Sequence, residues 1–403
     1  MMILPRFHTR RLLLVVPVAF LAACGGAAAA PASAPAGSDP LASQAAKVAG
    51  QPAAAAPHAG HSQGQSGDTA AAPLAGPSQA STGHASAGQA RSTPDVLASC
   101  PIFPANNVWN TDISKLPADP HSAAWLRSMD SGSTYLHPDF GPNAGGYPYG
   151  IPYTVVTNSH PKVRVSFTYA SESDRWLYPF GSDTRIEGGQ SAGGDRHALM
   201  LDTSSCRLYE LWNARYGSRA TAGSGAVWNL RSNALRPAGW TSADAAGLPI
   251  LPGLLNYGQV RRAASTGTPI RHAIRFTAVR TRSAYIWPAR HEAGSGTSVK
   301  LPPMGARFRL RLGFDVAGYC RSSTPYCADA KAVLTEMQHY GLILADNGSN
   351  WYFGGAAFPP WPDGLVSLLK GIPASQFQAV NESCLMVSPD SGRAQAHAGC
   401  PIG

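Results

Sequence analysis

The sequence predicts a mainly β fold, a β-sandwich or jelly-roll-like domain with a few peripheral helices, preceded by a disordered tether. Several segments alternate apolar and polar residues with period two, which is typical of β-strands. Short apolar segments are separated by loops rich in Gly, Pro, Asn and Asp. No Phe, Trp or Tyr occurs between Cys24 and Phe103, so that segment cannot bury enough apolar area to offset its ordering entropy. We therefore assign residues 24–95 to the tether and residues 96–403 to the β-rich domain.

The first 23 residues have the features of an export signal. Arg6, Arg10 and Arg11 precede an apolar stretch, Leu12 to Leu21, that is too short to span a bilayer. The stretch ends in Leu21-Ala-Ala-Cys24-Gly, which resembles the lipobox of bacterial lipoproteins. That resemblance implies a lipid on Cys24, which would hold the protein at the cell envelope, at the outer membrane where there is one. An ordinary secretory signal that happens to contain a cysteine is the alternative.

Composition narrows the function classes. Only 14% of the 403 residues are charged, and 32 Lys and Arg against 23 Asp and Glu give a net charge of +9. From residue 96 onward the excess is 27 against 20, or +7. A modest basic excess suits a polysaccharide or another cell-envelope polymer. No run of Lys and Arg occurs, so we expect no nucleic-acid partner.

Cysteine usage indicates disulfide bonds. Six cysteines follow Cys24, and an even number in an exported domain is typical of disulfide pairing. Cys320 and Cys327 flank a short Ser/Pro loop and are the expected local pair. Cys100 lies at the start of the domain, so a bridge from it to Cys384 or Cys400 would join the two ends. No C-x-x-C or H-x-x-x-H motif occurs, so we expect no zinc site and no cofactor.

The expected elements follow from periodicity and from residues that begin and end helices. Half-buried strands are expected at 162–169, 271–279 and 307–316, and a hairpin at 197–201 and 207–212. In the third strand Arg307 and Arg309 would lie on the polar face. Helices are expected at 119–129, where Asp119-Pro120 opens the segment, at 328–340 before Gly341, and at 363–370.

The densest polar cluster is the glycine-rich loop from Glu187 to Asp195-Arg196-His197. Glycines let backbone approach a ligand closely, and two carboxylates are what glycoside hydrolysis requires. We therefore name Glu187, Asp195 and His197 as candidate catalytic residues and Arg196 as a candidate substrate-binding residue. The alternative is that Asp195 caps a turn and pairs with Arg196 at the surface.

A second cluster is Trp287-Pro-Ala-Arg290-His291-Glu292. A sugar ring could stack on the Trp287 indole while Arg290 binds its oxygens, and His291 and Glu292 are candidate catalytic residues. The same residues would serve a lyase, in which an arginine neutralises a uronate carboxylate. A solvated loop is the alternative.

A third stretch carries the dipeptide Asn347-Gly348, which predicts a tight turn between two strands. Asp346 would then be a turn residue, and it is also a candidate substrate-binding residue. Trp351 and Tyr352 point to opposite faces of the second strand, so one of them could reach a binding cleft and stack against sugar.

Five blocks resemble recurring blocks of an uncharacterised family of secreted bacterial proteins. These blocks are Trp109-Asn-Thr-Asp112, Gly194-Asp-Arg-His197, Arg231-Ser-Asn-Ala-Leu-Arg-Pro-Ala-Gly-Trp240, Pro288-Ala-Arg-His291 and Ala345-Asp-Asn-Gly-Ser-Asn-Trp351. The resemblance covers most of residues 100–380 and implies no catalytic assignment.

Taken together, the sequence favours a tethered extracytoplasmic enzyme that acts on polysaccharide, a glycoside hydrolase with general acid and base carboxylates. A polysaccharide lyase acting on anionic glycans and a non-catalytic glycan-binding or adhesion lipoprotein are the alternatives. The hydrolase hypothesis requires that the Asp195 loop and the Arg290 loop open onto one cavity.

Overall fold

The computed structural model describes residues 96–144 and 146–395. The predicted signal segment 1–23, the tether 24–95 and the lipidation site Cys24 lie outside the described residues. The predicted mainly β class is confirmed, with four α-helices in the described part of the chain. No helix in that part is long and apolar enough to cross a membrane.

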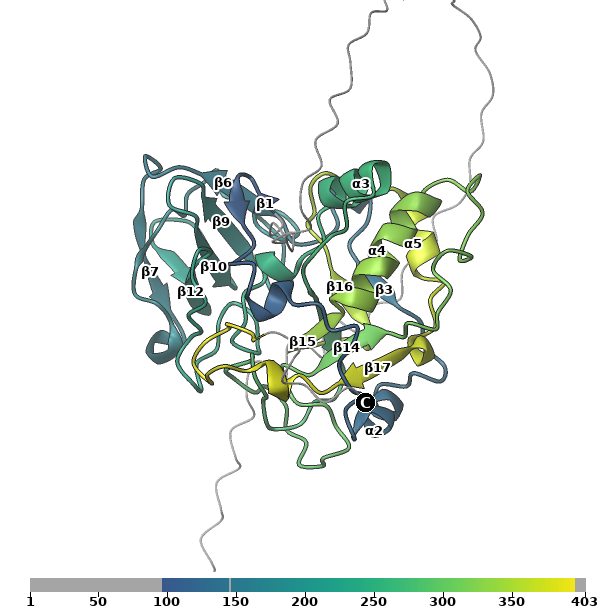
Figure 1. Cartoon of the computed structure of the whole chain (residues 1–403). Helices are drawn as coiled ribbons and strands as arrows, with labels where there is room; N and C mark the ends of the chain where they lie inside the picture. The colour runs from purple at the N-terminus through teal and green to yellow at the C-terminus, as the bar shows by residue number, and fades with distance from the viewer. Residues whose placement is uncertain (1–95, 145, 396–403) are drawn as a thin grey trace, which may run out of the picture. The chain divides into compact units, whose positions relative to one another are not determined.

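Two sheets form a β-sandwich (Figure 1). The four-stranded sheet has the order β12-β10-β9-β6 and the three-stranded sheet the order β11-β7-β8. Their strands are β6 (Tyr153–Val156), β7 (Val163–Phe167), β8 (Leu177–Tyr178), β9 (Ala198–Asp202), β10 (Arg207–Trp212), β11 (Ala220–Ala222) and β12 (Ser224–Asn229). Val165 and Tyr178 of one sheet share a core cluster with Met200 and Tyr209 of the other, so the two sheets face each other.

The remaining strands build a six-stranded mixed sheet with the order β17-β14-β15-β13-β16-β3. Its strands are β3 (His137–Asp139), β13 (Ile274–Ala278), β14 (Arg307–Leu310), β15 (Leu342–Asn347), β16 (Tyr352–Gly354) and β17 (Phe377–Val380). The helices are α2 (Ser122–Ser128), α3 (Tyr257–Thr266), α4 (Cys327–His339) and α5 (Asp363–Leu369). Helix α4 packs against α3, α5 and β14, and α2 packs against β17 (Figure 1).

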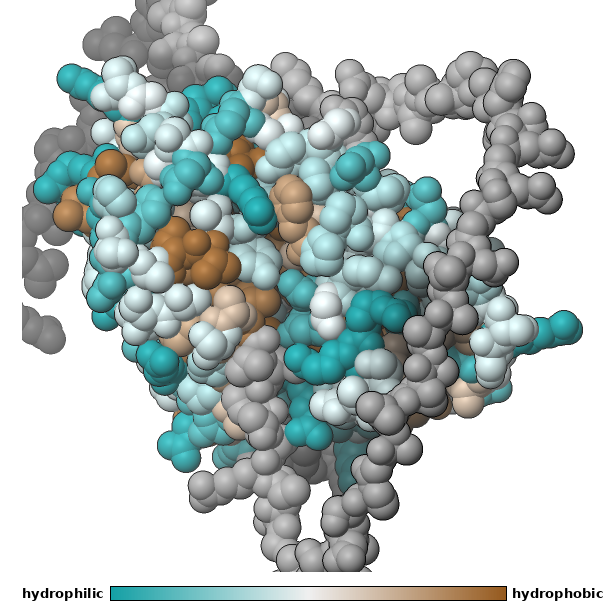
Figure 2. All heavy atoms as spheres, turned by 90° about the horizontal axis from the view of Figure 1, so that it is seen from above, coloured by the Kyte–Doolittle hydropathy of each residue, from teal (hydrophilic) through white to brown (hydrophobic). Residues whose placement is uncertain are grey.

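Short elements connect these layers. They are β1 (Val96–Leu97), β2 (Cys100–Pro101), β4 (Asn143–Ala144), β5 (Tyr147–Pro148) and the 3₁₀ helices η1 (Val108–Asn110), η2 (Ala170–Glu172), η3 (Leu251–Gly253), η4 (Ala374–Gln376) and η5 (Ser383–Leu385). Seen from above, the surface is largely hydrophilic, with an apolar cluster on the side of the sandwich sheets (Figure 2).

The four-stranded sheet is buried on both faces. Ala198 and Met200 of β9 point into the sandwich core, whereas Leu199 and Leu201 point into the main core beside the six-stranded sheet. This explains why β9 is a continuous apolar run instead of an alternating one. The predicted hairpin is confirmed, since β9 and β10 pair antiparallel with Leu208 opposite Leu201.

The predicted polar face of the 307–316 strand is wrong. Strand β14 ends at Leu310, and both Arg307 and Arg309 are buried. Arg307 donates to the Tyr340 carbonyl oxygen and to Glu382, and Arg309 donates to the carbonyl oxygen of Ile113. Buried guanidinium groups are tolerated here because backbone oxygens accept their hydrogen bonds.

The predicted helices are present with shifted ends. Helix α4 ends before Gly341, whose φ of 68° favours glycine, and α5 lies within the predicted 363–370 range. Helix α2 starts three residues after Asp119, because that carboxylate accepts from the His121 backbone N–H and does not cap Ser122.

The predicted Cys320–Cys327 disulfide is confirmed. The pairing of Cys100, which the sequence left open, is with Cys206 and not with a cysteine at the end of the domain. This bond joins β2 to the turn between β9 and β10, across 106 residues of sequence. Cys384 is also disulfide-bonded.

Candidate functional site

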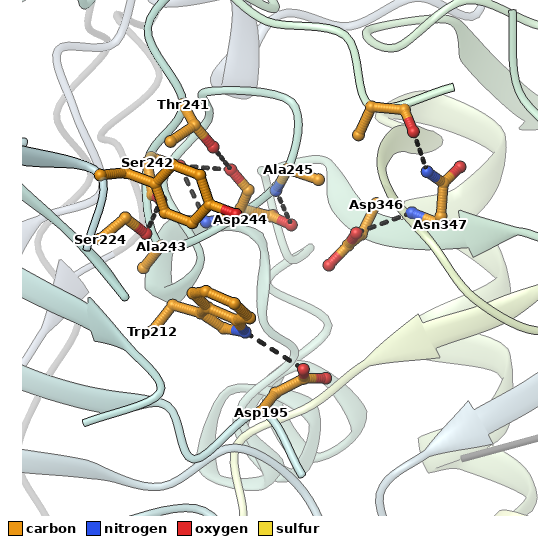
Figure 3. A pocket seen from close by; sticks show the side chains of 12 residues that line it. Asp195, Trp212, Ser224, Thr241, Ser242, Ala243, Asp244, Ala245, Asp346 and Asn347 are labelled. Atoms are coloured by element: carbon orange, nitrogen blue, oxygen red, sulfur yellow. Dashed lines mark hydrogen bonds between the residues drawn. The ribbon is translucent and has the colours of Figure 1, made fainter. Parts of the chain in front are cut away.

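The outstanding feature of the described residues is a cleft lined by five carboxylates, which we call the acid cleft. It consists of a cavity of ≈ 320 Å³ and an adjoining one of ≈ 40 Å³, which share Asp195, Asp346 and Asn347. The side chains of the acid cleft that carry chemistry are Asp139, Tyr149, Tyr169, Glu187, Asp195, His197, Trp212, Asp244, Arg275, Asp346 and Tyr352. Figure 3 shows Asp195 and Asp346 pointing into the space between them.

The acid cleft lies where the six-stranded sheet meets the sandwich. Asp139 ends β3, Arg275 lies on β13 and Asp346 on β15, whereas Glu187 and Asp195 come from the loop before β9. A β-bulge shifts the pairing of the parallel strands β13 and β15, so that Thr277 lies opposite Asp346 and Ala345 is skipped. Bulges of this kind redirect side chains and are common beside functional sites.

Arg275 is held against two carboxylates. Its Nε and Nη2 donate to Asp244 at 2.9 and 2.7 Å, and Nη2 lies 3.6 Å from Asp346. Burial raises the pKa of Asp346, and the negative charge of Asp244 raises it further, although Arg275 acts in the opposite direction. The net effect is a pKa well above that of an ordinary aspartate, so Asp346 retains its proton where other carboxyl groups have lost theirs.

Glu187 and His197 form an ion pair at the base of the cleft. His197 Nδ1 lies 2.7 Å from Glu187 Oε2, and its Nε2 lies 3.1 Å from the carbonyl oxygen of Ala243. Burial disfavours the charged imidazolium, but the charge and hydrogen bond of Glu187 outweigh it and raise the pKa of His197 to about 9. Burial also raises the pKa of Glu187, but His197 outweighs that effect and lowers it. Both residues are therefore charged at neutral pH.

The larger cavity of the cleft also contains a phenol hydrogen-bonded to a carboxyl group. Tyr149 Oη donates to Asp139 Oδ1. Burial raises the pKa of Asp139, the hydrogen bond from Tyr149 lowers it, and the charges of Glu187 and Asp195 raise it, with a net increase. Burial and the neighbouring Asp139 raise the pKa of Tyr149. The carboxyl groups of the cleft therefore repel one another across the cavity.

Aromatic rings complete the cleft. Trp212 Nε1 donates to Asp195 Oδ1 at 3.1 Å, which fixes the orientation of that carboxylate (Figure 3). The ring of Tyr169 lies 6.3 Å from the Trp212 ring, and Tyr352 stacks on His137 at 3.9 Å. A Cβ at Gly223 would lie 2.0 Å from the Trp212 ring, so glycine is required there.

Five of the residues predicted from the sequence meet in this cleft. They are Glu187, Asp195, His197, Asp346 and Tyr352. Asp346 is part of strand β15, so its assignment to a turn is wrong.

Two predicted substrate-binding residues are structural instead. Trp351 is fully buried, packs against Phe276 and Phe377, and donates to the Met129 carbonyl oxygen, so the prediction that it stacks on sugar is wrong. Arg196 is also buried and donates to the carbonyl oxygens of Gln190, Ala192 and Ala214. Its predicted role at the substrate and its alternative pairing with Asp195 are therefore both wrong.

The Trp287–Glu292 segment does not bring its side chains to the acid cleft. Trp287 and Arg290 line a separate cavity of ≈ 610 Å³, which we call the tryptophan pocket and which also contains Trp125, Tyr285, Glu382, Met386 and Asp390. His291 Nδ1 lies 2.8 Å from the Ala245 carbonyl oxygen and Nε2 3.9 Å from Glu172, while Glu292 lines neither cavity. Ala293, the residue after this segment, lines the acid cleft, but none of the four candidate side chains does. The prediction that the Asp195 loop and the Arg290 loop bring their candidate residues to one cavity is therefore wrong.

Sequence reasoning missed Asp139, Tyr149, Trp212, Asp244 and Arg275. Arg275 gave no signal in the sequence, because it alternates with Ile274 and Phe276 as a solvent-facing residue would. In the structure all five residues of β13 are buried, so the prediction that the strand at 271–279 is half-buried is wrong. A charged residue at such a position needs a buried partner, and that partner is Asp244. Asp139 and Asp244 lie in loops and strand ends with no distinctive spacing.

The described residues contain no group of three or more His, Cys, Asp or Glu side chains that could hold a metal ion. No protein-family model, curated protein or solved structure matches this chain.

Proposed function

We propose that this protein is a polysaccharide-active enzyme that hydrolyses glycosidic bonds by general acid and base chemistry in the acid cleft. The observation that carries the proposal is that Asp195, from the loop before β9, and Asp346, on β15, face one cavity beside the indole of Trp212 (Figure 3). Asp346 thus takes the place that was predicted for the Trp287–Glu292 segment. Paired carboxyl groups across a cavity are the catalytic requirement of most glycoside hydrolases, and an aromatic ring supports a sugar ring by stacking.

The two carboxyl groups take different roles. Asp346 is the general acid: its raised pKa keeps the proton that it donates to the glycosidic oxygen as the bond to the anomeric carbon breaks. Asp195, held by Trp212, is the carboxylate that accepts the proton of the attacking water as the new carbon–oxygen bond forms. The sum of these steps is one water consumed and one new reducing end, and each carboxyl group regains its starting state by exchanging a proton with solvent.

The same contacts disfavour the lyase alternative. Elimination from a uronate needs a cation that neutralises the substrate carboxylate. The cations among the described lining residues are Arg275 and His197, which are bonded to Asp244 and Glu187. The binding-protein alternative requires aromatic rings on a flat exposed face, whereas Trp212 and Tyr169 lie inside the cleft beside Asp195.

We also propose that the protein is exported and lipid-anchored at Cys24, at the outer membrane where the cell has one. We propose further that it belongs to the family of secreted bacterial proteins that the five sequence blocks resemble. The support is the signal-like segment together with the disulfides, which are typical of oxidising compartments outside the cytoplasm.

The test is to incubate the purified protein with a panel of polysaccharides and measure new reducing ends and ultraviolet absorbance. Hydrolysis raises reducing ends alone, and elimination also raises absorbance from unsaturated uronates. The matched control is the double variant Asp195→Asn/Asp346→Asn, which preserves side-chain size. Absence of reducing ends across the panel, or release that the double variant retains, would overturn the proposal.

A further inference from the structure

The charge of the acid cleft is opposite to that of the domain around it. The chain from residue 96 onward carries +7, yet the lining residues of the cleft comprise five carboxyl groups against two cations, His197 and Arg275. The positive net charge of the domain acts on a ligand at long range, and the carboxyl groups of the cleft act on it at short range. At physiological salt, charges more than about 8 Å apart are largely screened. The charge of a bound ligand is therefore selected mainly by the groups that line the cleft.

Both cations of the cleft are already paired with carboxyl groups of the protein. His197 is bonded to Glu187 and to a backbone carbonyl oxygen, and Arg275 makes a two-point contact with Asp244. Arg275 also approaches Asp346, so its single charge is shared between two carboxyl groups. Asp139 and Asp195 receive neutral donors, the Tyr149 hydroxyl and the Trp212 indole N–H. Asp346 keeps its proton, so the four other carboxyl groups of the cleft exceed the two cations by two.

This excess is built around a space of ligand size. The larger cavity of ≈ 320 Å³ is bounded by Tyr149 and Tyr352, and the adjoining one by Trp212 and Tyr169, so rings and acids line one continuous surface. A sugar ring stacked on an aromatic ring directs its ring substituents toward the carboxyl groups beside it. A cation on such a substituent would neutralise the excess, whereas an anion would add to the repulsion.

We propose, as a deepening of the proposed function, that the substrate of the acid cleft is a glycan with free amino groups, a polymer of partly or wholly unacetylated amino sugars. An ammonium group of the sugar lies against Asp139 and donates to its oxygens, while Asp195 stays free to take the proton of the attacking water. The assignment excludes uronate-containing and sulfated glycans as substrates.

The test compares one polymer in two charge states. Chitosan and its chemically re-acetylated form have the same backbone and differ in the charge of the amino group. We expect the purified protein to bind and cleave the free-amine form at least about tenfold better, which corresponds to about 1.4 kcal/mol of electrostatic preference. That preference should fall when salt is raised from about 0.05 M to about 0.5 M, while cleavage of the acetylated form stays constant. Asp139→Asn should reduce the preference by raising KM for the amine polymer.

Two readouts separate this inference from the proposed function. Binding of free-amine oligosaccharides without cleavage supports the charge assignment and overturns hydrolysis. Cleavage of acetylated, neutral or uronate glycans at equal or higher rates supports hydrolysis and overturns the charge assignment. Failure to bind or cleave any glycan, with folding verified by circular dichroism, overturns both.

Discussion

The acid cleft and the tryptophan pocket contain the same kinds of residue and differ in the balance between carboxyl groups and cations. In the tryptophan pocket Arg290 donates to the carbonyl oxygens of Arg236 and Pro389 and to Asp390, so its hydrogen-bonding capacity is used within the fold. In the acid cleft, carboxyl groups outnumber cations and raise one another's pKa. Repulsion among facing groups costs stability, and folds retain such arrangements mainly at functional sites. An excess of carboxyl groups over cations thus marks the candidate site, whereas Arg290, whose bonds are all made within the fold, has a structural role.

The largest expected effect is on kcat, and it is tested by making the same aspartate-to-asparagine substitution in each of the two sites. Asp346→Asn removes the proposed acid and should lower kcat about 10³-fold, because general acid catalysis contributes about 10²- to 10⁴-fold. Asp390→Asn makes the same exchange at a carboxylate that pairs with an arginine in the tryptophan pocket, and kcat should be unchanged. Steady-state kinetics on the best substrate of the glycan panel measures both.

The pH dependence of the same reaction provides a further check on Asp346. A general acid works in its protonated form, so activity should fall as pH rises through the raised pKa of Asp346. Equal loss of activity in the Asp346 and Asp390 variants would show that the exchange acts through folding and would remove the contrast between the sites.

The second effect is on the free energy of unfolding and comes from substituting Arg290 in the tryptophan pocket. Arg290→Met keeps the length of the side chain but leaves the Arg236 and Pro389 carbonyl oxygens without their donor, which should cost about 3 kcal/mol of unfolding free energy. Denaturant unfolding measures this loss. The kcat of the folded fraction should be unchanged. A stable variant with reduced kcat would instead place Arg290 in the catalytic machinery.

The third effect is the dependence of stability on pH. The pKa of His197 is raised to about 9, so its ion pair with Glu187 contributes fully below the unfolded value of 6.5 and is lost as pH rises toward 9. The shift sets an upper bound of about 3 kcal/mol. Glu187 acts in the opposite sense: its lowered pKa gives stability that is lost as pH falls below its ordinary value of 4.5.

This window is measurable by denaturant unfolding between pH 6 and pH 10. The native protein should lose stability over that range, and His197→Gln should lose much less. If the two proteins responded identically to pH, the ion pair would not be the source of the dependence.

Local patterns predicted the elements well. The β9–β10 hairpin follows from two apolar runs around a short turn, and α4 follows from its apolar stripe and Gly341. Such signals lie within about 20 residues of sequence, where periodicity and turn chemistry act. The faces of the strands were less predictable. Arg307 alternates with apolar residues as a solvent-facing residue would, yet it binds backbone oxygens in the core.

The site was predictable only in part for the same reason. Glu187, Asp195 and His197 are close in sequence, and their clustering was visible. Asp139 and Asp244 reach the cleft through the pairing of β3 with β16 and the contact with Arg275, which no local pattern encodes. Conversely, Arg290 appeared available because its acceptors lie up to 100 residues away.

The smallest expected effect tests whether a partly buried indole in the tryptophan pocket, Trp287, takes part in the reaction. Trp287→Phe removes the donor to the Ser391 carbonyl oxygen but keeps an aromatic ring, so kcat/KM should change by less than about twofold. The same exchange at Trp212 removes the donor that orients Asp195 and should lower kcat about tenfold. A loss at Trp287 equal to that at Trp212 would mean that substrate extends over both cavities, because no contact described between the two indoles could transmit the effect. The tryptophan pocket would then be a remote substrate-binding subsite of the acid cleft. The distinction between a structural and a chemical role would hold for single side chains such as Arg290, and not for the two cavities as wholes.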